Sequence, residues 1–70
     1  MSAKEMFEEL GYKQISNNVN YIIYNFEEIF ELRFYLPQQE IEIIEKPPFN
    51  TIDLGEIKAI NKQIEELGWK

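Results

Sequence analysis

The chain of 70 residues contains no cysteine and no histidine. The missing cysteines exclude disulfide bonds, thiolate metal ligands and thiol nucleophiles. The missing histidines exclude the side chain that most often moves protons near neutral pH. Carboxylates, tyrosine and lysine alone would have to carry any catalysis. We therefore expect a protein that is not an enzyme and that binds no cofactor.

Positive charge is also scarce, because 7 basic residues stand against 13 acidic ones and the formal net charge is -6. Proteins that bind nucleic acid gather Lys and Arg on one surface, whereas Arg33, Lys46, Lys58 and Lys62 are scattered along this chain. We therefore expect no direct binding of nucleic acid. Hydrophobic residues make up 44% of the sequence, which is too apolar for a disordered tail and predicts a single domain over residues 1–70.

Long apolar runs are missing as well. The uncharged segment around Val19–Phe26 is interrupted by Asn and Tyr and is too short to cross a bilayer. The N-terminal residues lack the apolar stretch of a signal peptide. We therefore expect a soluble, cytoplasmic protein with no membrane partner, and the absence of cysteine fits a reducing compartment.

The N-terminal segment carries the signals of a short helix. Ser2–Glu5 has the spacing of a capping box, in which the Ser and Glu side chains each satisfy a backbone N–H. Apolar residues then recur at helical spacing over Ala3–Leu10. Gly11 can take the left-handed conformation that ends a helix, which lets Tyr12 fold back on Phe7.

The C-terminal segment predicts a second, longer helix. Pro47–Pro48 indicates an extended connector before it. Asp53 and Glu56 form another capping box, and Gly68 ends the periodic pattern, so the helix is predicted over Leu54–Leu67. The apolar stripe expected to face the core consists of Leu54, Ile57, Ile60, Ile64 and Leu67.

Between the helices the hydrophobic pattern changes to the two-residue period of strands. The four predicted strands are Tyr12–Ser16, Val19–Tyr24, Ile29–Leu36 and Glu40–Glu45. The predicted turns lie at Asn17–Asn18, near Glu27–Glu28 and at Pro37–Gln38.

The last two strands predict their own register. A two-residue turn at Pro37–Gln38 places apolar residues opposite one another on the buried face and opposite charges across from one another on the other face. The predicted pairs are Phe34 with Ile41, Leu32 with Ile43, and Arg33 with Glu42. A single register therefore satisfies both faces of this hairpin.

The strand over Val19–Tyr24 has two admissible registers, because a shift of one residue exchanges its two faces. A two-residue turn at Glu27–Glu28 buries Tyr21 and Ile23 and leaves Ile22 and Tyr24 on the outer face. A three-residue turn buries Ile22 and Tyr24 instead. The sequence leaves both open.

These elements together predict an α+β fold with the order α-β-β-β-β-α. The antiparallel sheet is expected to have both helices packed on one face, because two layers suit a chain of this length. The predicted core residues are Met6, Phe7, Leu10, Leu32, Phe34, Ile41, Ile43, Ile57, Ile60, Ile64 and Trp69.

The two ends of the chain are similar to known sequences. Ala3–Tyr12 and Ala59–Trp69 resemble the opening and closing segments of a family of small phage and prophage proteins from low-GC Gram-positive bacteria. The resemblance covers roughly the terminal thirds of the chain. It implies an accessory gene of a mobile element, and it brings no catalytic motif to any position here.

The outer face of the predicted sheet is the candidate functional surface. It mixes apolar and aromatic side chains with carboxylates, as protein-binding surfaces do. The residues assigned to it are Ile29, Glu31, Arg33, Tyr35, Glu40, Glu42 and Ile44. A Mg²⁺ or Ca²⁺ site at Glu31, Glu40 and Glu42 is the alternative, but Arg33 lies among these carboxylates and no Asp-rich loop is present, so we expect no metal.

The charge and the resemblance together predict a small acidic phage or mobile-element protein that acts by binding a host or phage protein. In one mechanism it fills the basic nucleic-acid channel of a host defence nuclease as an acidic decoy, as many anti-CRISPR proteins do. In the other it is an accessory factor of phage replication or transcription. A homodimer, or a homo-oligomeric structural protein with no enzymatic role, is the remaining alternative.

Overall fold

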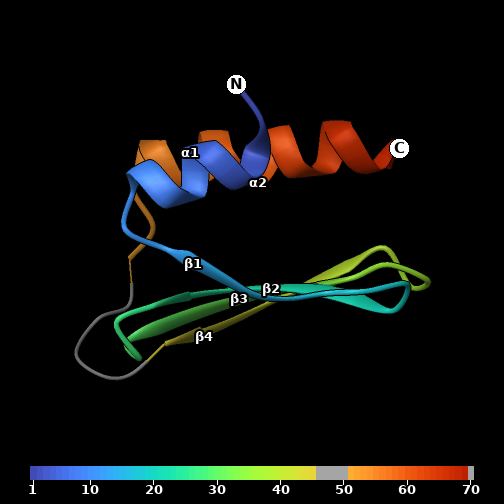
Figure 1. Cartoon of the computed structure of the whole chain (residues 1–70), viewed down its shortest axis with the longest axis horizontal. Coiled ribbons are helices and arrows are strands. Elements are labelled where there is room, and N and C mark those ends of the chain that lie inside the picture. Colours follow the sequence, from blue (N-terminus) through green and yellow to red (C-terminus); the bar gives the residue numbers. More distant parts are fainter. Residues whose placement is uncertain (46–50, 70) are drawn as a thin grey trace.

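The computed structural model of the protein describes residues 1–45 and 51–69 (Figure 1). Helices α1 (Ala3–Glu9) and α2 (Leu54–Leu67) lie side by side on one face of a four-stranded antiparallel sheet. The strands, each paired with the next along the chain, are β1 (Lys13–Asn17), β2 (Tyr21–Phe26), β3 (Phe30–Tyr35) and β4 (Glu40–Glu45). The predicted α-β-β-β-β-α architecture is therefore confirmed. The predicted connector at Pro47–Pro48 lies outside the described residues.

The first two strands begin later than the sequence predicts. The side chain of Asn18 accepts hydrogen bonds from the backbone N–H groups of Asn20 at 2.8 Å and Tyr21 at 3.1 Å. This arrangement places residues 18–20 in the turn, so Val19 is 84% exposed and belongs to no strand. The short Asn side chain competes with the strand ladder for backbone donors, which apolar periodicity does not record.

Both helices begin where the sequence predicts, and α2 also ends as predicted at Leu67, whereas α1 ends at Glu9, one residue before Leu10. Ser2 with Glu5, and Asp53 with Glu56, form complete capping boxes. The hydrogen bonds to Ser2 hold the pKa of the exposed Glu5 carboxyl below its ordinary value. Gly11 has a φ of +99° and follows α1. The next N–H group, that of Tyr12, donates to the Phe7 carbonyl at 2.9 Å, and the two aromatic rings meet edge to face.

Alanine at Gly11 is expected to destabilise the fold more than alanine at Gly68. Both glycines have positive φ, so each Gly→Ala change introduces about 1 kcal/mol of backbone strain. At Gly11 an added Cβ would also lie 2.7 Å from the Phe26 ring, whereas nothing lies within 4 Å of a Cβ at Gly68. Urea denaturation of both variants measures the difference. Equal losses would show that the Phe26 ring moves aside without cost.

The register of the last hairpin is confirmed, and the open register of β2 is settled. Phe34 pairs with Ile41 and Arg33 with Glu42, as the two faces of the hairpin require. Phe26 pairs with Phe30, so three residues separate β2 from β3. The three-residue alternative is therefore the correct one, and Ile22 and Tyr24 are buried beneath the helices.

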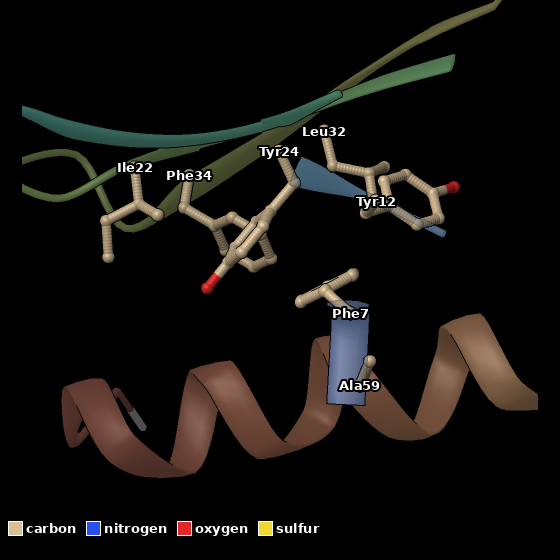
Figure 2. Packing of buried hydrophobic residues seen from close by; sticks show 7 residues of the cluster. All are labelled: Phe7, Tyr12, Ile22, Tyr24, Leu32, Phe34 and Ala59. Atoms are coloured by element: carbon tan, nitrogen blue, oxygen red, sulfur yellow. The ribbon is translucent and has the colours of Figure 1, made fainter. Parts of the chain in front are cut away.

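The core forms where α1 meets the inner face of the sheet (Figure 2). The Phe7 ring stacks on Tyr24 with 4.1 Å between ring centroids and meets Phe34 edge to face at 6.3 Å. Phe7, Tyr24, Leu32 and Phe34 are all less than 2% exposed. Trp69 is half-buried, with its ring centroid 6.3 Å from that of Phe34. Aromatic contacts between helix and sheet therefore dominate the packing.

The core differs from the prediction mainly along α2 and β4. Ile43 and Ile57, both predicted to be buried, are each 44% exposed, and Leu54 is exposed as well. Ala59 and Gln63 are buried in their place. The predicted core residues that are only half-buried are Met6, Leu10, Ile41, Ile60, Ile64 and Trp69.

Contacts with α1 explain the rotation of α2 about its own axis, and so which of its residues are buried. A Cβ added at Gly55 would lie 3.0 Å from the Leu10 side chain, so Gly55 faces α1. The Glu66 carboxylate, near the other end of α2, accepts a hydrogen bond from the Ala3 N–H at 2.8 Å. Ala59 lies between these two contacts at helical spacing. The small residues of α2 thus face α1. As a result, part of the predicted apolar stripe does not point into the core.

Tyrosine hydroxyl groups join the sheet to α2. Tyr24 donates to the Gln63 side-chain carbonyl at 2.6 Å and accepts a hydrogen bond from Gln14 at 3.2 Å. Tyr12 donates a hydrogen bond to the Glu56 carboxylate. Burial raises the pKa of both tyrosines, and for Tyr12 the bond to Glu56 raises the pKa further. Both phenols therefore stay protonated as hydrogen-bond donors well into the alkaline range.

Candidate functional site

The candidate site is the face of the sheet that points away from the helices, here called the outer face (Figure 1). Side chains alternate between the two faces of a strand, so the neighbours of the buried residues point outward. The outer-face residues of β2, β3 and β4 are Tyr21, Ile23, Asn25, Glu31, Arg33, Tyr35, Glu40, Glu42 and Ile44. Six of the seven residues that the sequence assigned to the site are among them. The seventh, Ile29, lies in the turn between β2 and β3.

Arg33 is the centre of a hydrogen-bonded network on this face. Its Nε donates to the Glu31 carboxylate, and its Nη1 lies 3.6 Å from Oε1 of Glu42. The Tyr35 hydroxyl donates to the same Glu42 oxygen at 2.7 Å. Interaction with Tyr35 and then with Glu31 raises the already high pKa of the Arg33 guanidinium. The arginine therefore stays charged, and its two acidic neighbours compensate that charge.

Apolar and aromatic side chains surround this network. Tyr21 pairs with Tyr35 across the sheet, and Ile23 pairs with Arg33. Ile44 pairs with Glu31 from the other side and is 38% exposed. These contacts give the outer face an aromatic and aliphatic ring around a neutralised arginine, a composition that protein-binding surfaces share.

The predicted residues form two adjoining groups. Ile29, Glu31, Arg33 and Ile44 line one open hollow beside the turn that joins β2 to β3. Tyr35, Glu40 and Glu42 line a second hollow toward the other end of β4. Both hollows are lined by residues of β3 and β4, so one partner surface can cover both.

The charge of this face is mainly acidic. Glu31, Glu40 and Glu42 stand against Arg33 and against Lys13 on the far strand. Within the described part of the chain Glu40 forms no ion pair, whereas Glu42 is held by Arg33. No group of three acidic side chains in residues 1–45 and 51–69 has the geometry of a metal site. The absence of a bound metal stays a prediction.

Sequence reasoning missed Tyr21 and Ile23 as members of the outer face. It left two registers open for β2, and it placed Ile22 and Tyr24 on the outer face for the case of a two-residue turn. The turn residues Glu27 and Glu28 both have positive φ, a conformation that Gly, Asn and Asp adopt more readily than Glu. The residue types of this turn therefore gave no signal of its geometry.

A third hollow lies on the helix side of the sheet. Leu10, Tyr12, Phe26 and Phe30 line it together with the first residues before and within α2. Its two carboxylates, Asp53 and Glu56, are engaged in the capping box and in the bond to Tyr12. These groups therefore serve the helix start and the contact between α2 and the sheet.

Comparison with protein-family models, with curated proteins and with solved structures found no match for this chain. The helices of the described residues are too short and too polar to cross a membrane.

Proposed function

We propose that the protein is a small acidic binding protein that docks its outer face on another protein and has no enzymatic role. The observation that carries this proposal is the uncovered sheet face on which Tyr21, Ile23, Tyr35 and Ile44 surround the neutralised Arg33. Tyrosine supplies a large, rigid contact area with a polar tip, and tyrosine and arginine are enriched among the residues that dominate interface affinity.

The acidic balance favours a partner with a basic surface. A formal charge of -6 speeds encounter with a positively charged groove and opposes binding to acidic proteins. The resemblance of the chain ends to phage and prophage proteins supports an origin in a mobile element. The proposed target is therefore a host protein in the bacterial cytoplasm, with a defence nuclease whose nucleic-acid channel is basic as the first candidate.

The test is capture of the partner by the wild-type protein and by a variant with an altered outer face. The variant Tyr35→Ala/Glu31→Lys/Glu42→Lys removes the aromatic contact and reverses two charges. We expect it to recover at least about tenfold less of the partner, because contacts at the centre of an interface dominate affinity. The captured partner should also lose nucleic-acid binding when the wild-type protein is added.

The matched control is Glu8→Lys/Glu9→Lys, which makes the same charge change on the exposed surface of α1. It should recover as much partner as the wild type, and circular dichroism should show that both variants are folded. Equal recovery by the outer-face variant would contradict the proposal. A stable homodimer that the outer-face variant dissociates, with no other partner, would assign this face to self-assembly instead.

A further inference from the structure

The outer edge of β4 has the chemistry of a docking site for an extended chain. We infer that β4 pairs with a segment of the partner protein in which basic and apolar residues alternate, so that the segment adds a fifth strand to the sheet. This inference rests on the proposed function only in taking the partner to be a protein, and it names the part of the partner that binds. Strand addition of this kind uses backbone hydrogen bonds for affinity and alternate side chains for specificity.

The backbone of β4 is open on one side. Within the described residues β4 is the last strand of the sheet, and β3 is its only neighbour. The Leu36 N–H donates to the Asn20 carbonyl at 3.0 Å, so the even-numbered residues of β3 hydrogen-bond to β2 and the odd-numbered ones to β4. Hydrogen-bonded and non-hydrogen-bonded pairs alternate along antiparallel strands. The odd-numbered residues of β3, which face β4, are paired with Glu40, Glu42 and Ile44. The N–H and C=O groups of Ile41, Ile43 and Glu45 therefore point to the open edge.

The side chains of β4 alternate in chemistry as well as in direction. Glu40 and Glu42 lie on the outer face, and Ile41 and Ile43 lie on the inner face. Ile43 is 44% exposed, so the inner side of this edge is apolar and incompletely covered. A strand laid beside residues 40–43 would meet carboxylates on one face and isoleucines on the other, and this order reverses at Ile44 and Glu45. Its complement is a segment with Lys or Arg on the outer face and apolar residues on the inner face.

Charge selects this occupant over a second copy of the chain. β4 carries Glu40, Glu42 and Glu45 and no basic residue. Pairing two copies of β4 would place these like charges close together, which is unfavourable across strands. In the described part of the chain neither Glu40 nor Glu45 forms an ion pair that a ligand would have to break.

The opposite edge of the sheet is less suited to pairing. β1 contains an irregularity between Gln14 and Ser16, at the exposed Ile15. A bulge bends the strand and interrupts the regular spacing of its outward hydrogen-bonding groups. β4 pairs with β3 without any such shift over its whole length. A straight, six-residue edge is therefore available on the β4 side alone among the described strands.

The test is titration of the ¹⁵N-labelled protein with the capped peptide Lys-Ile-Lys-Ile-Lys at low ionic strength, followed by NMR. We expect saturable shifts centred on β4 and slower hydrogen exchange at the amides of Ile41, Ile43 and Glu45. The peptide Lys-Lys-Ile-Ile-Lys has the same composition without the alternation, and we expect about tenfold weaker binding. The peptide Glu-Ile-Glu-Ile-Glu should not bind. Absence of saturable shifts, or equal binding of the two basic peptides, would overturn the inference.

Variants separate this inference from the proposed function. Glu40→Lys should weaken peptide binding by about tenfold, and Glu9→Lys, the same charge change on α1, should leave it unchanged. Tyr21→Ala, two strands from the edge, should weaken capture of the partner without affecting the peptide. Shifts at Tyr21 and Ile23 without protection of the β4 amides would show that the peptide lies across the outer face. That result would overturn strand addition while the proposed function stands.

Discussion

Replacement of Phe34 by alanine is expected to remove about half or more of the free energy of unfolding. Phe34 is fully buried, and its ring contacts those of Phe7, Tyr24 and Trp69 at centroid distances of 6.1–6.3 Å. Truncation of a buried phenylalanine removes about 3–5 kcal/mol, because transfer energy is lost and a cavity remains. A chain of this length is stable by about 4–10 kcal/mol in total. The loss is therefore about half of the total stability or more, and urea denaturation followed by circular dichroism measures it.

Val19→Ala is the matched control, because it also truncates an apolar side chain in the sheet region to a methyl group. Val19 is exposed in the turn after β1, so the expected change in the free energy of unfolding is below about 0.5 kcal/mol. A Phe34→Ala variant that unfolds at nearly the wild-type urea concentration would contradict the central place of this ring. It would mean that the helices close over the cavity at little cost.

Replacement of Tyr24 by phenylalanine is expected to destabilise the fold by about 2 kcal/mol, even though almost no volume is lost. The Tyr24 hydroxyl donates to the buried side-chain carbonyl of Gln63. Without that donor the carbonyl of Gln63 stays buried and unpaired, and the desolvation of this group is no longer compensated. Gln63→Leu should destabilise as well, because it leaves the Tyr24 hydroxyl without its acceptor.

The double variant Tyr24→Phe/Gln63→Leu gives the decisive measurement. Replacing both partners by apolar groups of similar shape removes the unpaired atoms, so the double variant should be more stable than the sum of the single losses predicts. The coupling measured in this cycle should reach about 1 kcal/mol. Additive losses would show that the two side chains do not depend on each other.

The sequence predicted the β3–β4 register and left the β2–β3 register open for the same physical reason. In the last hairpin one face is apolar and the other is charged, so only one pairing puts Phe34 opposite Ile41 and Arg33 opposite Glu42. In β2 all four residues from 21 to 24 are apolar or aromatic, and either face could be buried. The length of the turn between β2 and β3 determines which register forms. The two glutamates in this turn gave no indication of that length.

The orientation of α2 shows a second limit of periodicity. Counting apolar residues at helical spacing favours the stripe that includes Ile57, whereas the structure buries Ala59 and Gln63. Ala59 is selected by its small size on the side of α2 that approaches α1, and Gln63 is selected by its hydrogen bond to Tyr24. Neither property is visible in a hydrophobic pattern. Both depend on partners that only the folded chain brings together.

The candidate site was more predictable than the core. Alternation along β3 and β4 was enough to place Glu31, Arg33, Tyr35, Glu40, Glu42 and Ile44 on one face. The aromatic pair of Tyr21 and Tyr35 was not foreseen, because it needs the register of β2.

Trp69 gives the molecule an internal optical probe. It is the single tryptophan of the chain, and its indole lies near Phe34 beneath β3. Arg33 and Tyr35, the neighbours of Phe34 along the strand, belong to the outer face. A ligand that bends or stiffens β3 from outside would therefore alter the environment of the indole on the other side. Intrinsic fluorescence can report both unfolding and docking in unlabelled protein, without touching the surface under study.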